Sequence, residues 1–151
     1  MDTFTPISSE SLVDRYRFIY KERMQDLPIV NSALEVEAVG FRVFDVHQIG
    51  VLISPWFMNL VLLLGTDIGS RLKQGSKSTL RFPSGPVEFI TSQDETLGPY
   101  LTAVLFRSVA DFADQGTTRA VALEVMQELF DAARNKDAVS RRELFTTVGT
   151  G

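Results

Sequence analysis

Apolar side chains recur at helical spacing near both ends of the chain. In residues 9–25 they form one stripe, made by Leu12, Val13, Tyr16, Ile19 and Tyr20, with Ser8 or Ser9 available as the N-cap. In residues 117–134 they again follow three- and four-residue steps, at Val121, Ala122, Val125, Met126, Leu129 and Phe130. We therefore expect two helices, each of which packs one face against the rest of the protein.

The middle of the chain carries short apolar runs and turn residues that predict strands. Residues 34–39 alternate apolar and polar side chains, and residues 41–44 and 49–54 flank a turn-like segment, which predicts a hairpin. A further strand is expected at 58–64. Residues 66–78 are rich in Gly, Ser and Lys, so they predict an excursion that holds one short helical turn.

A second hairpin and an inner strand follow. Strands at 79–82 and 87–91 flank Pro83, Ser84, Gly85 and Pro86, whose backbone preferences suit a chain reversal. We expect an acidic loop at 92–98 and an inner strand at 99–106. This order of elements predicts a single α+β domain in residues 1–135, with a mostly antiparallel sheet and the N-terminal and C-terminal helices packed on it. A tail with a short helix is expected in residues 136–151.

Composition and charge exclude several classes of protein. The chain has 151 residues, of which 44% are hydrophobic and 23% charged, enough for one domain with a real core. Its net charge of -4 lacks the basic surface that nucleic acid requires. The absence of cysteine removes disulfides, thiolate metal sites and iron–sulfur clusters. We therefore expect no nucleic-acid partner, no metal and no cofactor.

The N-terminus and the longest uncharged stretch both favour a cytoplasmic protein. Residues 1–10 contain no Lys or Arg and no apolar run, so they do not resemble a secretory signal. Residues 46–66 lack charged side chains, but Gly50, Pro55 and Asn59 interrupt them. Because Pro55 would break a helix, we expect two buried strands that meet there, and no stable insertion into a membrane.

Few residues offer catalytic chemistry. His47 lies in the expected turn at 45–48, without a second His or a Cys nearby to complete a metal site. Glu35 and Glu37 lie two apart on an expected strand and share a face, as the carboxylates of an acid–base site would. A solvent-facing strand explains them more simply. A small ligand-binding or hydrolytic enzyme that uses Glu35, Glu37 and His47 stays open as an alternative.

The corner between two expected strands holds the single tryptophan. Trp56 is preceded by Pro55 and followed by Phe57, Met58 and Asn59. Aromatic and methionine side chains serve as anchors on partner-binding surfaces, but they also fill core corners. Tyr100 can likewise be a strand entry or a rim residue whose hydroxyl meets water. Both interpretations remain open.

The C-terminal tail contains a twin-arginine segment. Residues 140–145 read Ser-Arg-Arg-Glu-Leu-Phe, which resembles the S-R-R-x-F-L export consensus with Leu and Phe exchanged. Export signals are N-terminal, so this one is not expected to act as such. A helix capped by Ser140 and Glu143 explains the segment. Alternatively, Arg141 and Arg142 belong to a mimic of a partner's leader that occupies this protein's own groove or that of a second copy, which would make a symmetric dimer.

Six sequence blocks resemble one known family. They are MQDLPIVN at 24–31, ISPWFMNLVLLL at 53–64, LRFPSGPVEF at 80–89, GPYLTAVLF at 98–106, FADQ at 112–115 and the closing SRRELF. In this order, over residues 20–146, they are similar to the HybE/HupJ family of nickel-iron hydrogenase assembly chaperones. The combination is specific, although each block alone is weak.

The resemblance implies a function that composition alone does not suggest. It implies a non-enzymatic cytoplasmic chaperone that attends the hydrogenase small-subunit precursor, with its twin-arginine leader, and possibly the large subunit. Some relatives carry a rubredoxin module, but this sequence has no cysteine to build one. A structural accessory subunit that stays in the finished hydrogenase is a further alternative.

A leader is cationic ahead of its apolar region, so acidic clusters would steer it electrostatically. Such clusters are Glu35 with Glu37, Asp94 with Glu95, and Asp111 with Asp114. The aromatic corner at residues 55–59 would bind the apolar region of the leader. The expected partner-binding residues are Glu35, Glu37, Pro55, Trp56, Phe57, Met58, Asn59, Tyr100, Arg141 and Arg142.

Overall fold

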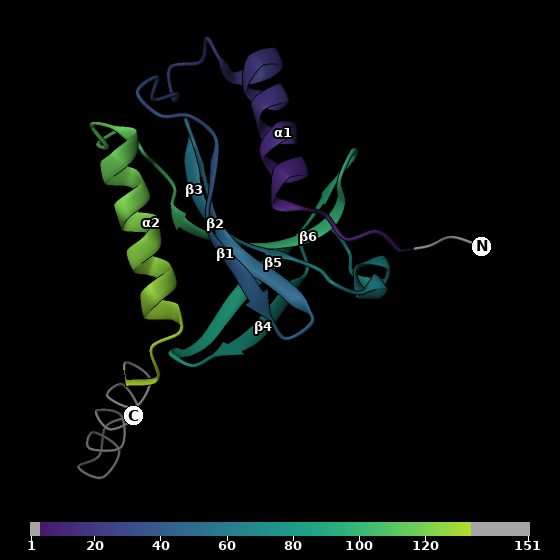
Figure 1. Cartoon of the computed structure of the whole chain (residues 1–151). Coiled ribbons are helices and arrows are strands. Elements are labelled where there is room, and N and C mark those ends of the chain that lie inside the picture. The colour runs from purple at the N-terminus through teal and green to yellow at the C-terminus, as the bar shows by residue number, and fades with distance from the viewer. Residues whose placement is uncertain (1–3, 134–151) are drawn as a thin grey trace, which may run out of the picture.

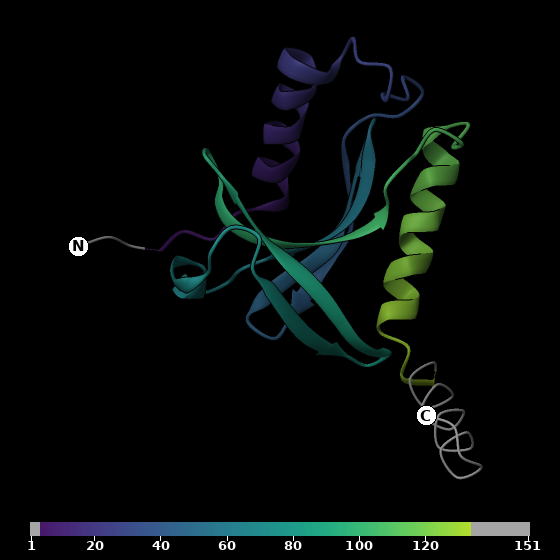
Figure 2. The same ribbon diagram turned by 180° about the vertical axis from the view of Figure 1, so that it is seen from behind.

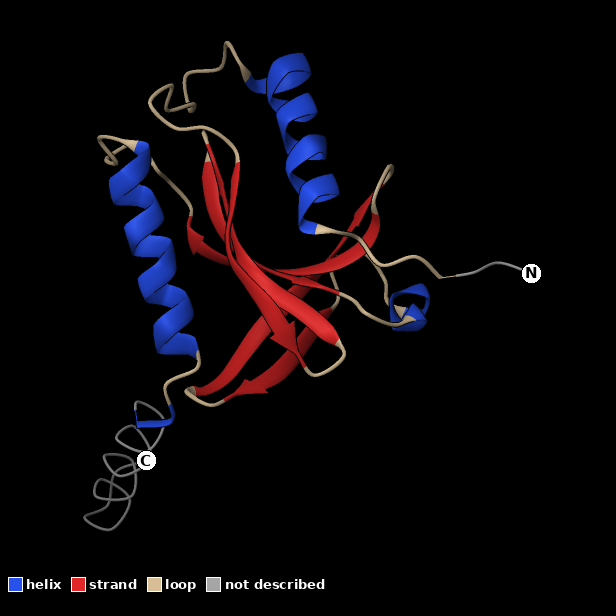
Figure 3. Cartoon of the chain, in the orientation of Figure 1, coloured by secondary structure: helices blue, strands red, loops and turns tan. Residues whose placement is uncertain are grey.

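Six antiparallel strands form one sheet, and a helix covers each of its faces (Figure 1, Figure 3). The computed structural model describes residues 4–133. The elements are α1 (Ser9–Ile19, continued by a π-helical turn at Tyr20–Met24), β1 (Glu37–Phe44), β2 (His47–Ser54), β3 (Phe57–Leu63), a 3-10 helix (Asp67–Arg71), β4 (Lys77–Phe82), β5 (Gly85–Asp94), β6 (Gly98–Phe106) and α2 (Gln115–Leu129). The strand order is β1-β2-β3-β6-β5-β4. The predicted α+β fold is therefore confirmed.

The central strands β2 and β3 are buried on both faces. Alternate side chains point to opposite sides, so Leu52, Val61 and Leu63 pack with Leu12 of α1. The remaining buried apolar side chains of the two strands pack with α2, and they are Ile49, Val51, Ile53, Met58, Leu60 and Leu62. Two-sided burial explains the unbroken apolar run in the sequence. No helix within residues 4–133 is long and apolar enough to cross a membrane.

Side-chain caps determine where the two helices begin. The Ser11 backbone N–H donates to Ser8 Oγ at 3.0 Å, and the Ser8 N–H donates to Ser11 Oγ at 3.1 Å. Ser8 is therefore the cap of α1, one of the two residues expected. The cap of α2 is Asp114, whose carboxylate accepts from the Thr117 N–H at 2.7 Å. This helix thus begins before the expected residue 117, and it ends at Leu129 rather than at 134.

The first strand is continuous but bulged. The sequence predicted two segments, 34–39 and 41–44, whereas β1 is one strand from Glu37 to Phe44 in which two residues, Gly40 and Phe41, lie opposite Gly50. Gly40 takes a positive φ of 68°, and a Cβ on Gly50 would lie 2.2 Å from the Phe41 ring. The bulge therefore requires both glycines.

The outer strands curl towards each other on the α2 side of the sheet. The rings of Phe44 at the end of β1 and Phe82 at the end of β4 stack 4.3 Å apart, although these strands are the two edges of the sheet. Phe82 also contacts Phe89 and Phe130, with ring centres 6.0 Å and 5.9 Å away. Figure 2 shows the β4–β5 hairpin folded beneath α2. The sheet is therefore an open barrel around a core that α2 covers.

The second hairpin is confirmed, with longer strands than expected. β5 begins at Gly85, so only Pro83 and Ser84 form the turn. β5 also extends to Asp94, and the predicted acidic loop at 92–98 is reduced to 95–97. The predicted domain boundary at 135 and the short helix of the tail lie outside the described residues.

Candidate functional site

The turn between β2 and β3 emerges between the two helices. Figure 1 shows it where the C-terminal end of α1 and the N-terminal end of α2 lie on either side of the sheet. Ser54 Oγ accepts from the backbone N–H groups of Trp56 at 3.1 Å and Phe57 at 3.0 Å. The buried hydroxyl thus holds the two-residue turn Pro55–Trp56 in one conformation.

Aromatic residues of α1 hold Trp56 in place. The Trp56 ring is nearly parallel to that of Tyr20, with centres 6.2 Å apart and an interplanar angle of 12°. It lies 6.3 Å from Tyr16 and meets Phe57 edge-on at 5.3 Å. Both Trp56 and Phe57 stay half-exposed, whereas Pro55 and Met58 are buried. The corner therefore exposes part of both of its aromatic side chains, and the buried Pro55 and Met58 support them.

A hollow of about 400 Å³ lies beside Trp56. One wall is the connection from α1 to β1, residues 28–32, and the other is the connection from β6 to α2, residues 107–110. Its rim is mixed, since Ile29 is 63% exposed and the polar Ser32 and Ser108 lie beside it. Arg107 is the one charged side chain among the described residues that line it. We refer to this site as the Trp56 hollow.

The walls of the Trp56 hollow are joined by Asn31. Its backbone N–H donates to the carbonyl of Pro55 at 2.7 Å. Its side-chain amide donates to the carbonyls of Val109 at 2.9 Å and Phe112 at 2.8 Å. The hollow offers an aromatic floor, an exposed isoleucine, polar side chains and one cation, which suits binding of a protein surface. Among the described residues that line it, no nucleophile is paired with a base.

Two other residues expected to bind a partner lie behind this surface. Tyr100 is buried, and its hydroxyl is hydrogen-bonded to that of Tyr16. Burial raises the pKa of Tyr16, and the Tyr100 hydroxyl raises it further, so Tyr16 stays neutral. Asn59 is half-buried, and its Oδ1 has no hydrogen-bond partner within residues 4–133. Arg141 and Arg142 lie outside the described residues.

Most carboxylates of the expected acidic clusters are engaged within the chain. Glu37 accepts from Arg119 at 2.6 and 3.0 Å and from Gln115 at 2.9 Å. The hydrogen bond from Arg119 lowers the pKa of Glu37 despite partial burial. Asp114 is occupied as the cap of α2. Glu35 and Asp111 are exposed, and Glu35 precedes β1 rather than sharing a strand with Glu37 as expected.

The remaining acidic pair is bound to α1. Arg15 Nε donates to both carboxylate oxygens of Asp94 at 3.0 Å, and Glu95 lies 3.3 Å from Arg15 and from Arg23. Burial opposes the charged form of Asp94, but hydrogen bonds from Leu97, Thr96 and Arg15 outweigh it and lower its pKa. These carboxylates therefore fasten α1 to the turn between β5 and β6.

The enzymatic alternative fails on geometry, because its three residues do not converge. Glu37 pairs with Ile53 at one end of the β1–β2 hairpin, and His47 pairs with Phe44 at the other. His47 and Ile53 are six positions apart on β2, which corresponds to roughly 20 Å at about 3.3 Å per residue. His47 opens β2 rather than lying in the turn, and its Nδ1 accepts from the Gly65 N–H at 2.8 Å. Within residues 4–133, no three Asp, Glu or His side chains gather as metal ligands would.

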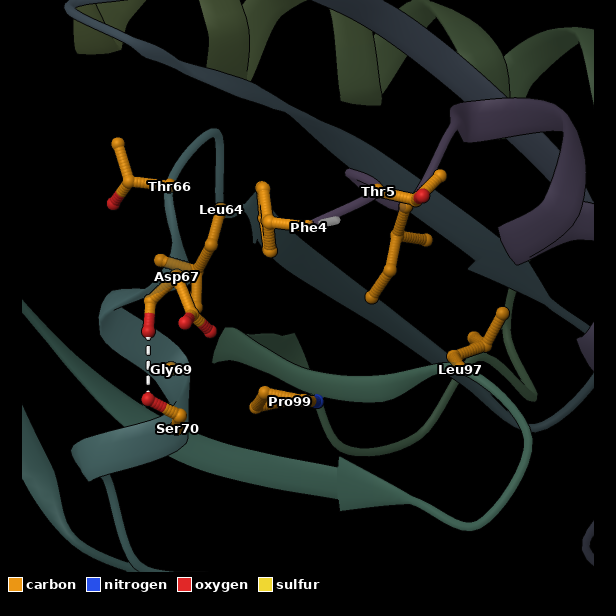
Figure 4. A pocket seen from close by; sticks show the side chains of 10 residues that line it. Phe4, Thr5, Leu64, Thr66, Asp67, Gly69, Ser70, Leu97 and Pro99 are labelled. Atoms are coloured by element: carbon orange, nitrogen blue, oxygen red, sulfur yellow. Dashed lines mark hydrogen bonds between the residues drawn. The ribbon is translucent and has the colours of Figure 1, made fainter. Parts of the chain in front are cut away.

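A more enclosed cavity of about 220 Å³ lies where the N-terminal segment crosses the 3-10 helix. Figure 4 shows Phe4, Leu64 and Pro99 along its walls, and Ser70 Oγ donating to the Asp67 carbonyl at 2.8 Å. Asp67 is its one titratable lining side chain in the described chain. The cavity is a packing seam without a catalytic pair.

Sequence reasoning identified Trp56 but missed what surrounds it. Tyr16 and Tyr20 were assigned only to a helical stripe, and Ile29 and Arg107 were not singled out. Together with Trp56, these residues come from four separate segments, so no local pattern marks them as neighbours. The one available signal was Ile29, an apolar residue in a predicted loop.

The chain is similar to proteins of hydrogenase formation. The profile of the family described as NiFe-hydrogenase assembly, chaperone, HybE matches residues 8–147. The hydrogenase expression/formation protein HupJ of Bradyrhizobium diazoefficiens is 40% identical over 136 residues, which cover 90% of this chain and 79% of that protein. The probable rubredoxin HupJ of Rhodobacter capsulatus is 42% identical over 136 residues, 89% of this chain and 49% of that protein. This chain thus spans about half the length of the second relative.

A solved structure has the same fold. The solution structure of HybE from Escherichia coli superposes with a TM-score of 0.66 and 18% sequence identity. The match covers 86% of this chain and 81% of that chain. At this identity, the likeness extends to the arrangement of strands and helices.

Proposed function

The chain belongs to the HybE family of NiFe-hydrogenase assembly chaperones, and we propose that it binds a hydrogenase small-subunit precursor, alone or with the large subunit, before export. The proposal extends the family function to a named client and to the cytoplasm, where a precursor still carries its leader. The observation that supports it best is the Trp56 hollow, because a fixed, half-exposed aromatic residue beside an exposed isoleucine and polar side chains is typical of a protein-binding surface.

Binding at the hollow would bury apolar client surface without covalent chemistry. Trp56 offers a rigid ring that loses little side-chain freedom, because Tyr20 and Phe57 already confine it. Ile29, on the wall formed by residues 28–32, lines the same hollow as Trp56 and is exposed. Such anchors commonly carry most of an interface's binding energy, so a small set of substitutions should reveal the site.

Charge steering contributes less than the sequence suggested. Glu37, Asp94, Glu95 and Asp114 are engaged within the chain. Glu35 and Asp111 are the members of the expected clusters whose carboxylates make no hydrogen bond or ion pair within residues 4–133. Exposed charges chiefly raise the rate of association. We therefore assign affinity for the client to the Trp56 hollow.

The experiment is a pull-down with the full-length chain against small-subunit precursor, the same subunit without its leader, and the large subunit. We expect the precursor to be retained. Trp56→Ala or Ile29→Ser should lower its affinity by at least about tenfold, as truncation of an interface anchor does. Leu123→Ser is the matched control, because Leu123 is also exposed but lies on α2 away from the hollow lining.

Three outcomes would change the proposal. Retention of folded subunit regardless of leader would assign the hollow to a mature subunit surface. Copurification with finished hydrogenase would indicate an accessory subunit. Failure to retain any subunit would contradict the proposed clients.

A further inference from the structure

Strands β5 and β6 part in the middle of the sheet. Their pairing ends at Ile90 and Thr102, although both strands continue beyond it. From there, residues 85–89 pair with β4 alone. Ala103, Val104 and Phe106 pair with β3 alone, and Leu105 forms a bulge without a partner on β3. Figures 1 and 2 both show β5 and β6 diverging on the side of the sheet where α2 lies. The facing edges of β5 and β6 therefore make no backbone pairs with each other over these residues.

The curl of the outer strands explains this separation. Phe82 and Phe89 carry the β4–β5 hairpin towards Phe44 and Phe130, and β6 remains on β3. Pro86 also cannot donate a backbone hydrogen bond, so the first half of β5 is a poor partner for a ladder on both sides. The gap is thus built into the packing of the core.

A cavity of about 380 Å³ lies between the edges of β5 and β6 and helix α2. We call it the wedge. Val87, Ala103, Leu105 and Val125 give it an apolar lining, and Val104 on β6 is 57% exposed. Its lining within residues 4–133 includes the carboxylates of Glu88 and Glu128 and no basic side chain.

We propose that the wedge binds an extended peptide segment of a client, which adds a strand along residues 103–106 of β6. Apolar side chains on one face of the segment would pack on Ala103 and Leu105, and a flanking Arg or Lys would meet Glu88. This inference deepens the proposed function and rests on it, since it supplies the chemistry of one client segment. That chemistry is an apolar stretch in β conformation with a basic residue beside it.

Three features of the wedge favour this occupant over a helix or a small molecule. Unpaired strand edges supply backbone donors and acceptors for a further strand, and the bulge at Leu105 makes the β6 edge irregular at one position. Four residues of β6 span about 13 Å, enough to pair a short peptide segment. The exposed carboxylate of Glu88 complements a cation, and the apolar lining would receive every second side chain of a strand.

The test uses the full-length chain and a dye-labelled peptide of two arginines followed by six residues that alternate leucine and serine. We expect saturable binding by fluorescence anisotropy and slower hydrogen exchange of the amides in 103–106. Two more peptides carry N-methyl groups on all leucines or on all serines, so each lacks amide donors along one edge of the strand. One of them should bind like the parent peptide, and the other at least about tenfold more weakly.

Glu88→Lys tests the charge, and Glu88 is exposed, so this variant should fold. We expect about tenfold weaker binding of the arginine peptide, while Glu10→Lys, an exposed glutamate on α1, leaves it unchanged. Equal binding of both N-methylated peptides, or an unchanged affinity in Glu88→Lys, would overturn the inference. So would a dimer in sedimentation without peptide whose 103–106 amides are already protected, because a second copy would then fill the wedge.

The precursor pull-down separates this inference from the proposed function. If the wild-type chain retains precursor but does not bind the peptide, strand addition in the wedge is wrong and the proposed function stands. If no hydrogenase subunit is retained, the proposed clients are wrong, and the peptide titrations still decide whether the wedge accepts a strand.

Discussion

The hydroxyl groups of Tyr16 and Tyr100 are hydrogen-bonded to each other, and this contact fastens α1 to the centre of the sheet. Tyr16 also packs against Trp56 and Phe57, at 6.3 Å and 5.5 Å between ring centres. The same residue therefore links the buried core to the aromatic floor of the Trp56 hollow. Removal of this hydrogen bond should therefore lower the stability of the protein more than its affinity for a client.

Tyr100→Phe should destabilise the protein by about 1–2 kcal/mol, because the largely buried Tyr16 hydroxyl loses its partner. The double variant Tyr16→Phe with Tyr100→Phe should cost less than the sum of the single changes, since neither hydroxyl is then left unpaired. Urea unfolding of the four proteins measures both effects. Additive costs would show that the two hydroxyls contribute independently.

Asp94 should make stability depend on pH in the acid range. Its pKa is lowered from the ordinary value of 3.8, so its contribution is present above that value and is lost as the pH falls through the lower folded-state pKa. Asp94→Asn should therefore be less stable than wild type at neutral pH, with a gap that narrows below 3.8. Unfolding at a series of pH values measures the gap. A gap that stays constant into strong acid would show that the charge of Asp94 is unimportant.

The same Gly→Ala change should have opposite effects at two sites. A Cβ on Gly65 would lie 1.6 Å from the Val46 carbonyl oxygen, so Gly65→Ala should cost at least about 3 kcal/mol. Gly116 lies in α2 with its nearest neighbour at an ordinary 3.6 Å, so Gly116→Ala should stabilise by about 0.5–1 kcal/mol. Thermal unfolding of both variants provides the comparison. Two changes of the same sign would contradict this prediction.

Trp56 is the single tryptophan, so its fluorescence reports directly on the hollow. Binding of a client there should shift its emission to shorter wavelength and protect it from acrylamide, because water leaves the ring. The Arg-Leu-Ser peptide in the wedge should leave both signals unchanged, since Trp56 does not line the wedge. A client that binds without altering the emission would indicate a different surface.

Local patterns in the sequence predicted the elements with local causes. The stripe at Leu12, Tyr16 and Ile19 marked α1, and two-sided burial made β2 and β3 recognisable as continuous apolar runs. Asp114 was an available cap signal that the sequence analysis missed, which is why it placed the start of α2 too late.

Features that depend on distant residues were not accessible in this way. The bulge in β1 requires Gly40 and Phe41 to face Gly50, ten residues along the chain from Gly40. The wedge depends on Phe44 stacking on Phe82, a contact between the two outermost strands. Neither the bulge nor the wedge produces a periodic pattern in the sequence from which it could be predicted.

Asn31 has a consequence for how the hollow would engage a partner. Through three hydrogen bonds it joins the loop after α1, the β2–β3 turn and the loop before α2. The hollow is thus preorganised, and a partner would not bear the entropic cost of ordering two loops. Asn31→Ala removes the two side-chain hydrogen bonds to the loop before α2 and keeps the backbone bond to Pro55. It should therefore weaken binding mainly through faster dissociation and make affinity more sensitive to temperature.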